Sequence, residues 1–287
     1  MSFFVENFKL LRVLSFISTT YQEDIDIGHL VHLRYLALQS PKCEYAKLPF
    51  SYFLNLETLN LHSSIPCFFE LPQHICKMVK LRHLYTKKGI SKTHYIDYHS
   101  SKLESLQTLH RICHCRDCRK FLVTRTPHLR KLGVYGKIMS KDGVLMLPNL
   151  ELLKCLETLS FTDRFSGTRV ASTLPAGLKL PPTVTRLTLK DTFLKWEELS
   201  ILQTLPSLEK WNASTDQFRG LEILALRGCK KLEGIPIDFA NLSELHEIKM
   251  EQCSRSANES AREIQEEQKY KRGDDDCLNL LARANLF

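Results

Sequence analysis

The sequence lacks the long apolar segments that are typical of membrane and secreted proteins. No stretch approaches the ~20 consecutive apolar residues that a membrane-spanning helix needs. The apolar residues 3–5 are followed at once by polar and charged residues, among them Glu6 and Lys9, so they do not form the uninterrupted apolar core of a secretion signal. We therefore expect no membrane span, and a protein of the cytoplasm or of the cytoplasm and nucleus together.

The motifs of the common enzyme classes are missing as well. The sequence contains no GxSxG nucleophile turn, no HExxH zinc motif and no GxxxxGK[ST] phosphate loop. We therefore predict no catalytic residue, no enzymatic activity and no bound cofactor.

The cysteines do not form a complete metal site in the sequence. Cys115 and Cys118 have the CxxC spacing of half a zinc site, and Cys113 and His114 lie beside them, but a second half-site is missing. We favour a turn in which these cysteines act as small buried residues with reduced thiols. The three aspartates at 274–276 are interpreted as part of a solvated tail. The sequence thus predicts no metal site, while leaving open whether 113–118 ever binds an ion.

The net charge of +8 does not indicate a nucleic-acid-binding protein. Lysine and arginine number 40 against 32 acidic residues, and the two signs are interleaved along the chain. Binding to nucleic acid needs a contiguous basic patch, which the sequence does not show. We predict no nucleic-acid partner.

An apolar pattern recurs along the chain in place of these absent motifs. In each copy one apolar residue is followed by a second three positions later and a third two positions beyond that, and most copies lie 22 to 28 residues apart. The central residues of the copies are Leu14, Leu36, Leu59, Leu84, Leu109, Leu132, Leu159, Leu187, Trp211, Leu224 and Ile248. The copies centred on Leu84, Leu109 and Trp211 are weaker, because their third position is polar or small.

This period predicts a leucine-rich repeat array, in which short strands stack and share one core. We expect an α/β solenoid, a horseshoe of about eleven irregular repeats with a parallel concave sheet and a C-terminal capping helix. The solenoid is expected over residues 1–253. A cap helix, starting near Ser256, and a charged flexible tail are expected over 254–287.

One step in the array is only 13 residues long, from Trp211 to Leu224. Half a repeat cannot continue a strand ladder in register. We therefore predict a defect near 209–220, either a bulged or disordered connection from 210 to 218 or a break in the stack.

A further position, three residues after the last apolar residue of a copy, is expected to hydrogen-bond the turning backbone or to be buried. The residues at this position that fit are Thr19, Ser64, Thr192, Cys229 and Cys253.

The residues that alternate with the core positions form the candidate binding surface, because successive side chains of a strand point to opposite faces. We define this outward face by Tyr35, Gln39, Asn60, His62, His83, Tyr85, Lys87, His110, Lys131, Tyr135, Arg186, Lys190, Arg227, Glu247 and Lys249. Tyrosine, histidine and arginine are typical of protein interfaces, and the basic middle favours an acidic protein partner. Any single residue in this set is also explained by simple exposure to water.

Several segments resemble the repeat region of plant intracellular nucleotide-binding immune receptors of the late-blight-resistance type found in solanaceous plants. They are FKLLRVL at 8–14, IGHLVHLRYL at 27–36, LPQHIC at 71–76 leading to LRHL at 81–84, residues 103–109, WEE at 196–198, LPSLE at 205–209 and SAREIQEEQ at 260–268. The resemblance covers nearly the whole chain. It implies a fragment that lacks the coiled-coil and nucleotide-binding domains of the family, so nucleotide binding is not carried over.

The resemblance implies a non-catalytic recognition module of plant defence, which binds a pathogen effector or a host protein and helps to autoinhibit a full-length receptor through contact with its nucleotide-binding domain. Two alternatives remain. One is a substrate adaptor of a ubiquitin-ligase complex, which would need an F-box helix set before the repeats, and the other is a non-functional truncated paralogue. The sequence does not identify the ligand or the oligomeric state.

Overall fold

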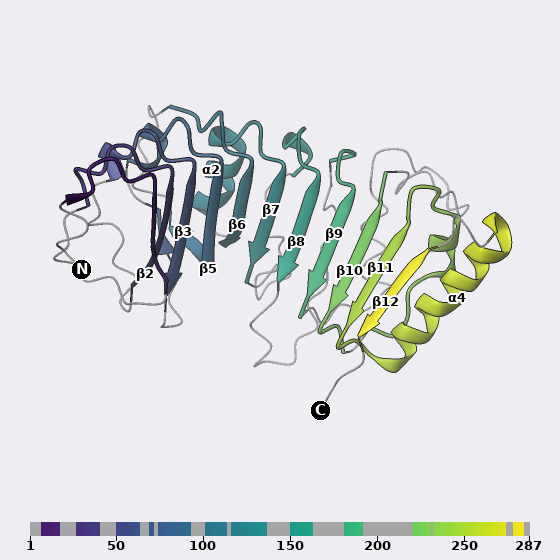
Figure 1. Cartoon of the computed structure of the whole chain (residues 1–287). Helices are drawn as coiled ribbons and strands as arrows, with labels where there is room; N and C mark the ends of the chain where they lie inside the picture. Colours follow the sequence, from purple (N-terminus) through teal and green to yellow (C-terminus); the bar gives the residue numbers. More distant parts are fainter. Residues whose placement is uncertain are drawn as a thin grey trace. The chain divides into compact units, whose positions relative to one another are not determined.

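The computed structural model describes residues 7–17, 27–40, 50–63, 69–71, 74–92, 101–113, 116–136, 150–162, 181–191, 220–230, 232–273 and 278–283. The chain forms two compact units, residues 1–134 and 135–287. Both are built from short parallel strands separated by irregular or helical return segments (Figure 1). Each unit is described by itself.

Unit 1 contains a parallel sheet in which the strands follow one another in chain order. Its strands are β1 (Val13–Phe16), β2 (Tyr35–Ser40), β3 (Thr58–Ser63), β5 (His83–Lys92), β6 (Thr108–Cys113) and β7 (Lys131–Tyr135), of which the last residue, Tyr135, already belongs to unit 2. The short β4 (Phe69–Glu70) pairs with β5. Its helical segments are the 3-10 helices η2 (Phe50–Tyr52) and η3 (Ile75–Lys77) and the α-helix α2 (Arg116–Arg125). Sequential strands that are all parallel are the arrangement expected of a solenoid, because each return segment brings the chain back beside the previous turn.

Unit 2 continues the same pattern of strand and return segment. Its strands are β8 (Thr158–Thr162), β9 (Arg186–Lys190), β10 (Ile223–Arg227), β11 (Glu247–Glu251) and β12 (Asn279–Arg283), in that order in the sheet. Its helices are the 3-10 helices η4 (Leu150–Leu152) and η7 (Ile237–Asn241) and the α-helix α4 (Arg255–Arg272). Among the described residues of both units, no helix is long and apolar enough to cross a membrane.

The predicted central residues form the core, and the register aligns them from turn to turn. Leu36 lies opposite Leu59, which lies opposite Leu84, and in unit 2 Leu187 pairs with Leu224. These side chains are buried. The predicted parallel-strand α/β solenoid with leucine-rich repeats is therefore confirmed.

In the weak copy centred on Leu84, the polar residue at the third position, Thr86, makes a hydrogen bond to the next strand. Thr86, two residues after the centre of β5, is buried, and its Oγ1 donates to the carbonyl oxygen of His110 on the next strand over 2.9 Å. A buried hydroxyl needs such a partner, and the threonine therefore keeps the place of a leucine in the core.

Of the two forms predicted for the defect near Trp211, a break in the stack is not seen between the strands on either side, β9 and β10. β9 pairs directly with β10 over five residues, from Arg186 opposite Ile223 to Lys190 opposite Arg227. The two strands are therefore direct neighbours in the sheet, where adjacent strands lie about 4.8 Å apart. The segment expected to be bulged, 210–218, lies outside the described residues.

The C-terminal helix is present, but its start and its sequel differ from the prediction. Its N-cap is Ser254, whose side chain accepts a hydrogen bond from the backbone N–H of Ala257 at 3.1 Å, rather than Ser256. Residues 279–283, expected to belong to a flexible tail, form β12, which pairs in register with β11. Helix α4 is therefore the return segment of a further turn. The domain boundary between 253 and 254 stays a prediction.

Candidate protein-recognition surface

All the residues of the outward face lie on strands, next to the buried central residues. Unit 1 carries Tyr35, Gln39, Asn60, His62, His83, Tyr85, Lys87, His110 and Lys131, and unit 2 carries Tyr135, Arg186, Lys190, Arg227, Glu247 and Lys249. Because the strands are parallel and in register, residues at equivalent positions of adjacent turns lie side by side. The outward face is therefore two continuous surfaces, one on each unit.

Aromatic rings occupy the middle of the unit 1 surface. The rings of His83 and Tyr85 on β5 stack with their centroids 6.2 Å apart and an angle of 20° between planes. His110 on β6 lies 6.2 Å from Tyr85 at 50°. His83 also shares a hydrogen bond with the Thr108 hydroxyl at 3.1 Å. These contacts hold large ring surfaces in fixed positions, which lowers the entropy lost when a partner binds.

The charge of this surface comes from lysines rather than histidines. Partial burial lowers the pKa of His62 below its ordinary value of 6.5, and the nearby Lys87 lowers it further. Burial also lowers the pKa of His83, with Lys131 and Arg82 adding to the effect against the opposing charge of Glu57. Both rings are therefore mostly neutral at pH 7. Lys87 and Lys131 are exposed and supply the positive charge.

Gly133 on β7 also belongs to this surface. It was not among the predicted binding residues because it has no side chain that could contact a partner. A Cβ built on Gly133 would lie 2.9 Å from the backbone nitrogen of Arg111 and 3.4 Å from the His110 ring. Only glycine therefore fits beside His110 without a shift. A glycine within a strand is a signal of such close approach, and it was available in the sequence.

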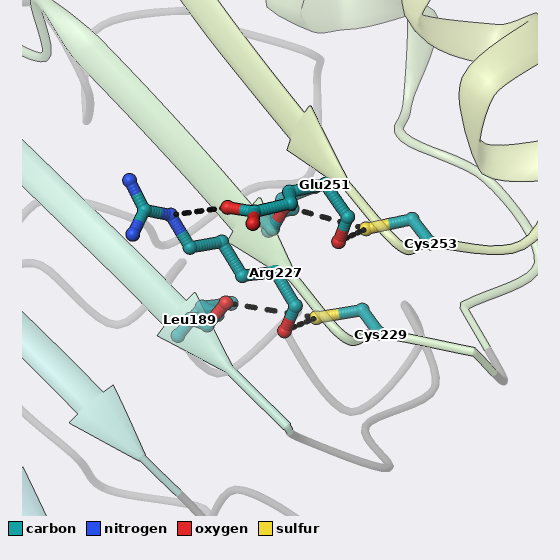
Figure 2. Close-up of polar contacts among 6 residues, drawn as sticks. Leu189, Arg227, Cys229, Glu251 and Cys253 are labelled. Atoms are coloured by element: carbon teal, nitrogen blue, oxygen red, sulfur yellow. Dashed lines mark hydrogen bonds and ion pairs between the residues drawn. The ribbon is translucent and has the colours of Figure 1, made fainter. Parts of the chain in front are cut away.

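In unit 2, three of the four cations of the outward face are paired with carboxylates, and Lys190 is the fourth. Arg186 lies 3.7 Å from Glu222, Arg227 lies 3.3 Å from Glu251 (Figure 2), and Lys249 lies 2.6 Å from Glu247. Exposed ion pairs contribute little stability, but they cancel charge that a partner would otherwise meet. The net positive charge of the outward face in unit 2 is therefore small.

Tyr135 departs from the expected exposure. It lies on the outward side of β7, yet only 6% of its surface is accessible. A side chain that is already covered adds little contact area to an interface. We therefore leave Tyr135 out of the surface that a partner could reach.

The turns after β10 and β11 confirm the prediction that the residue three positions after the last apolar residue of a copy hydrogen-bonds the turning backbone. Figure 2 shows the Cys229 thiol directed at the carbonyl oxygens of Leu189 and Arg227, at 3.7 and 3.6 Å. The Cys253 thiol repeats this arrangement one turn later, at 3.3 Å from Leu226 O and 3.5 Å from Glu251 O. Each cysteine thus ties its own turn to the previous one. The equivalent residues Thr19, Ser64 and Thr192 lie outside the described residues.

The comparison with known families agrees with this architecture. A family model described as a leucine-rich repeat region matches residues 1–213. The chain belongs to the leucine-rich repeat family.

The relatives of this leucine-rich repeat chain are plant resistance proteins. It is 31% identical to late blight resistance protein R1-A of Solanum demissum over 298 residues, which cover 91% of this chain and 23% of that protein. It is 30% identical to a putative late blight resistance protein homolog of the same plant over 296 residues, again with 91% of this chain and 23% of the homolog covered. The leucine-rich repeat chain thus spans about a quarter of the length of these relatives.

Solved structures similar to the leucine-rich repeat chain share little sequence with it. An internalin (inlF) from Listeria monocytogenes is 14% identical, with 98% of this chain and 89% of that chain covered and a TM-score of 0.47. The functional domain of InlJ from the same bacterium is 15% identical, with coverage of 85% and 49% and a TM-score of 0.44.

The cysteine cluster of this leucine-rich repeat chain is divided between two elements. Cys113 ends β6, while Cys118 lies on α2, a helix where a turn was expected, and both are buried. The Cys118 thiol donates to the carbonyl oxygen of Ile90 at 3.3 Å, so it acts as a small buried residue that ties α2 to β5. His114 and Cys115 lie outside the described residues. Within the described ranges, no three potential metal ligands lie together.

Proposed function

We propose that this chain is a non-catalytic protein-recognition module of a plant immune receptor, which binds a pathogen effector or a host protein through its outward face. The observation that carries the proposal is the similarity to late blight resistance proteins along 91% of the chain. The fixed aromatic cluster of β5 and β6 supports a binding role, because rigid aromatic side chains supply contact area at low entropic cost.

The unit 1 part of the outward face is the proposed centre of recognition. Tyr85 and His110 supply ring surface, and Lys87 and Lys131 lie at its border. A partner with carboxylates around an apolar or aromatic anchor would complement this arrangement. The paired cations of unit 2 contribute polar contacts with little net charge.

In a full-length receptor, the same chain would also contact the nucleotide-binding domain and help to keep it inactive. This chain aligns with 23% of the length of R1-A, so the rest of such a receptor is available as an internal partner. Recognition of effectors inside the plant cell places the proposed function in the cytoplasm, or in the cytoplasm and nucleus.

The test replaces the matching segment of R1-A with this chain and measures cell death in leaves, with and without the pathogen. The recognition variant combines Tyr85→Ala, Lys87→Glu and Lys131→Glu. We expect it either to lose the response to the pathogen or to trigger death without it, because both recognition and autoinhibition need this face.

The matched control also removes one tyrosine and reverses two positive charges, but away from the outward face. It combines Tyr270→Ala, Lys154→Glu and Arg262→Glu, all at exposed positions. This control should behave as the unmodified chimera does. The proposal fails if the recognition variant and the control respond identically in both conditions at equal protein levels.

A further inference from the structure

Three aliphatic side chains are exposed in line on consecutive turns of unit 1, outside the outward face. Val31, Leu54 and Val79 each lie five residues before the central leucine of β2, β3 and β5 respectively. Their exposed fractions are 42%, 51% and 53%. We name these three residues the apolar stripe. A single exposed leucine is ordinary, but exposed apolar residues repeated at one structural position form a surface.

The three turns that carry the apolar stripe have the same backbone geometry. In each, the residue just before the stripe residue is buried, and its carbonyl oxygen accepts a hydrogen bond from the backbone N–H three residues later. These bonds are Leu33 N–H to Leu30 O at 3.1 Å, Leu56 N–H to Phe53 O at 3.1 Å and Leu81 N–H to Met78 O at 3.0 Å. Each stripe residue is therefore held outward by the burial of its neighbour.

Side-chain hydrogen bonds also connect these turns to one another. The Asn55 amide donates to the carbonyl oxygen of Val31 at 3.0 Å, and Lys80 donates to the Asn55 side-chain oxygen at 2.7 Å. Between the same turns, the backbone N–H of Glu57 donates to Arg34 O, and that of Arg82 donates to Glu57 O, both at 2.8 Å. The ladder thus continues from the strands toward the stripe, and the apolar stripe is a fixed surface.

Positive charge surrounds the apolar stripe. Lys77, Lys80, Arg82 and Lys102 are all exposed on the same turns or the next one. Two carboxylates share these turns. Glu57 lies 3.4 Å from Arg34, and Glu104 lies 3.3 Å from the His128 ring. The border is therefore cationic overall, and a partner with carboxylates beside its apolar residues would complement it.

We propose that the apolar stripe and its basic border bind an acidic amphipathic helix of a protein partner, laid across the turns. The spacing favours a helix over an extended segment. Adjacent turns of the sheet lie about 4.8 Å apart, whereas a helix advances about 5.4 Å per turn, so apolar residues at i, i+4 and i+7 can meet consecutive stripe residues. Same-face residues of an extended segment lie about 6.7 Å apart, and the mismatch approaches 4 Å over two steps.

This inference does not depend on the proposed function. It uses none of the residues of the outward face, and it would stand if the chain recognised nothing through that face. A helix lying on a hydrophobic strip with charged flanks is a general mode of peptide recognition.

The experiment uses the full chain and two synthetic peptides of equal composition, with binding measured by fluorescence anisotropy. The first peptide is a helix with leucines at i, i+4 and i+7 and glutamates on the adjoining positions. The second carries the same residues with the leucines at every second position, as an extended segment would present them. We expect the first peptide to bind at least tenfold more tightly than the second, and the binding to weaken as salt concentration rises.

Two variants of the chain locate the binding. Leu54→Ser removes the middle of the apolar stripe, and Leu152→Ser removes a leucine of similar exposure, 54%, on η4 of unit 2. Both positions are at the surface, so both variants should unfold at the temperature of the parent chain. We expect Leu54→Ser to weaken binding of the helical peptide at least tenfold and Leu152→Ser to leave it unchanged.

Equal binding of the two peptides, or equal effects of the two variants, would overturn the proposal. Two further outcomes would also count against it by assigning the surface to another occupant. One is self-association of the chain in analytical ultracentrifugation that Leu54→Ser abolishes. The other is binding to vesicles of anionic phospholipid that needs Leu54, because a basic apolar surface can also meet a membrane.

Discussion

Gly228, in the turn after β10, offers a test of how tightly neighbouring turns constrain each other. Its φ angle is +65°. The equivalent residue of the previous turn, Asp191 after β9, has a φ of +55°. The backbone N–H of Asp191 donates to Arg227 O at 2.7 Å, and that of Gly228 donates to Glu251 O at 2.8 Å. The left-handed conformation therefore lets each turn hydrogen-bond the next.

The substitution Gly228→Ala should destabilise unit 2 for two separable reasons. A left-handed conformation costs a residue with a Cβ about 1–2 kcal/mol. The new Cβ would also lie closer than 3.0 Å to Asp191 Oδ1, a separation that Cβ atoms essentially never show, and 3.4 Å from Asp191 Cα. Moving the short aspartate side chain off its rotamer adds about 0.5–1.5 kcal/mol, so we expect a total loss of about 1.5–3.5 kcal/mol.

A double-mutant cycle with Asp191→Ala separates the two contributions. In the Asp191→Ala background no carboxylate opposes the new Cβ, so Gly228→Ala should cost only the backbone term of about 1–2 kcal/mol. The coupling between the two positions should therefore be about 1 kcal/mol. The free energies are best measured by hydrogen exchange of the amides in β10 and β11, because a solenoid need not unfold in a single step.

The control is Gly273→Ala at the end of α4. Gly273 also has a positive φ, of 87°, but a Cβ there meets nothing within 4 Å. It should destabilise through backbone strain alone and show no coupling to Asp191. Strictly additive effects of Gly228→Ala and Asp191→Ala would refute the argument that the carboxylate crowds this turn.

Three further predictions concern single side chains. Thr86→Val keeps the shape of the buried side chain but removes its hydrogen bond to the carbonyl oxygen of His110. The free energy of unfolding, measured by urea denaturation, should fall by about 1–3 kcal/mol, and an unchanged value would contradict the role of that bond. A hydrogen bond from the Cys229 thiol lowers the pKa of Cys253 from 9.0 to about 7, against the opposing effect of burial. The rate of alkylation of Cys253, followed by mass spectrometry, should therefore be half-maximal near pH 7. In Cys229→Ala the midpoint should shift to higher pH. The pKa values of His62 and His83 are lowered in the folded chain, so near and below pH 6.5 the unfolded chain binds more protons than the folded chain. The free energy of unfolding should therefore fall as the pH drops through 6.5. The fall should be smaller when both histidines are replaced by glutamine.

The sequence predicted the part of the fold that the apolar period controls. Leu36, Leu59 and Leu84 had to lie on one spine, because only stacking buries a strand that cannot bury its own apolar face. It also predicted the backbone hydrogen bonds of Cys229 and Cys253, because their place relative to the strand fixes the chemistry required there.

What the sequence did not reveal depends on contacts between turns. The strand at 279–283 follows a helix and carries only two leucines, so its pairing with β11 leaves no clear signal in the period. The exposure of Tyr135 and the pairing of Arg227 with Glu251 depend on neighbours that are distant in the sequence. Periodicity assigns a residue to a face of a strand, but it does not say whether that face is covered or whether its charge is matched.

The stacking also determines how charged residues on adjacent turns interact, which bears on the proposed partner of the apolar stripe. Equivalent residues of adjacent turns lie about 4.8 Å apart, so like charges in one column repel and opposite charges stabilise. The chain uses opposite charges where Arg34 meets Glu57 and where Arg227 meets Glu251. Lys77 and Lys102, which also border the apolar stripe, occupy the same position of consecutive turns, and no ion pair is found for either among the described residues. An anionic partner would reduce the repulsion between these two lysines, so we expect it to bind more tightly than a neutral partner of the same shape.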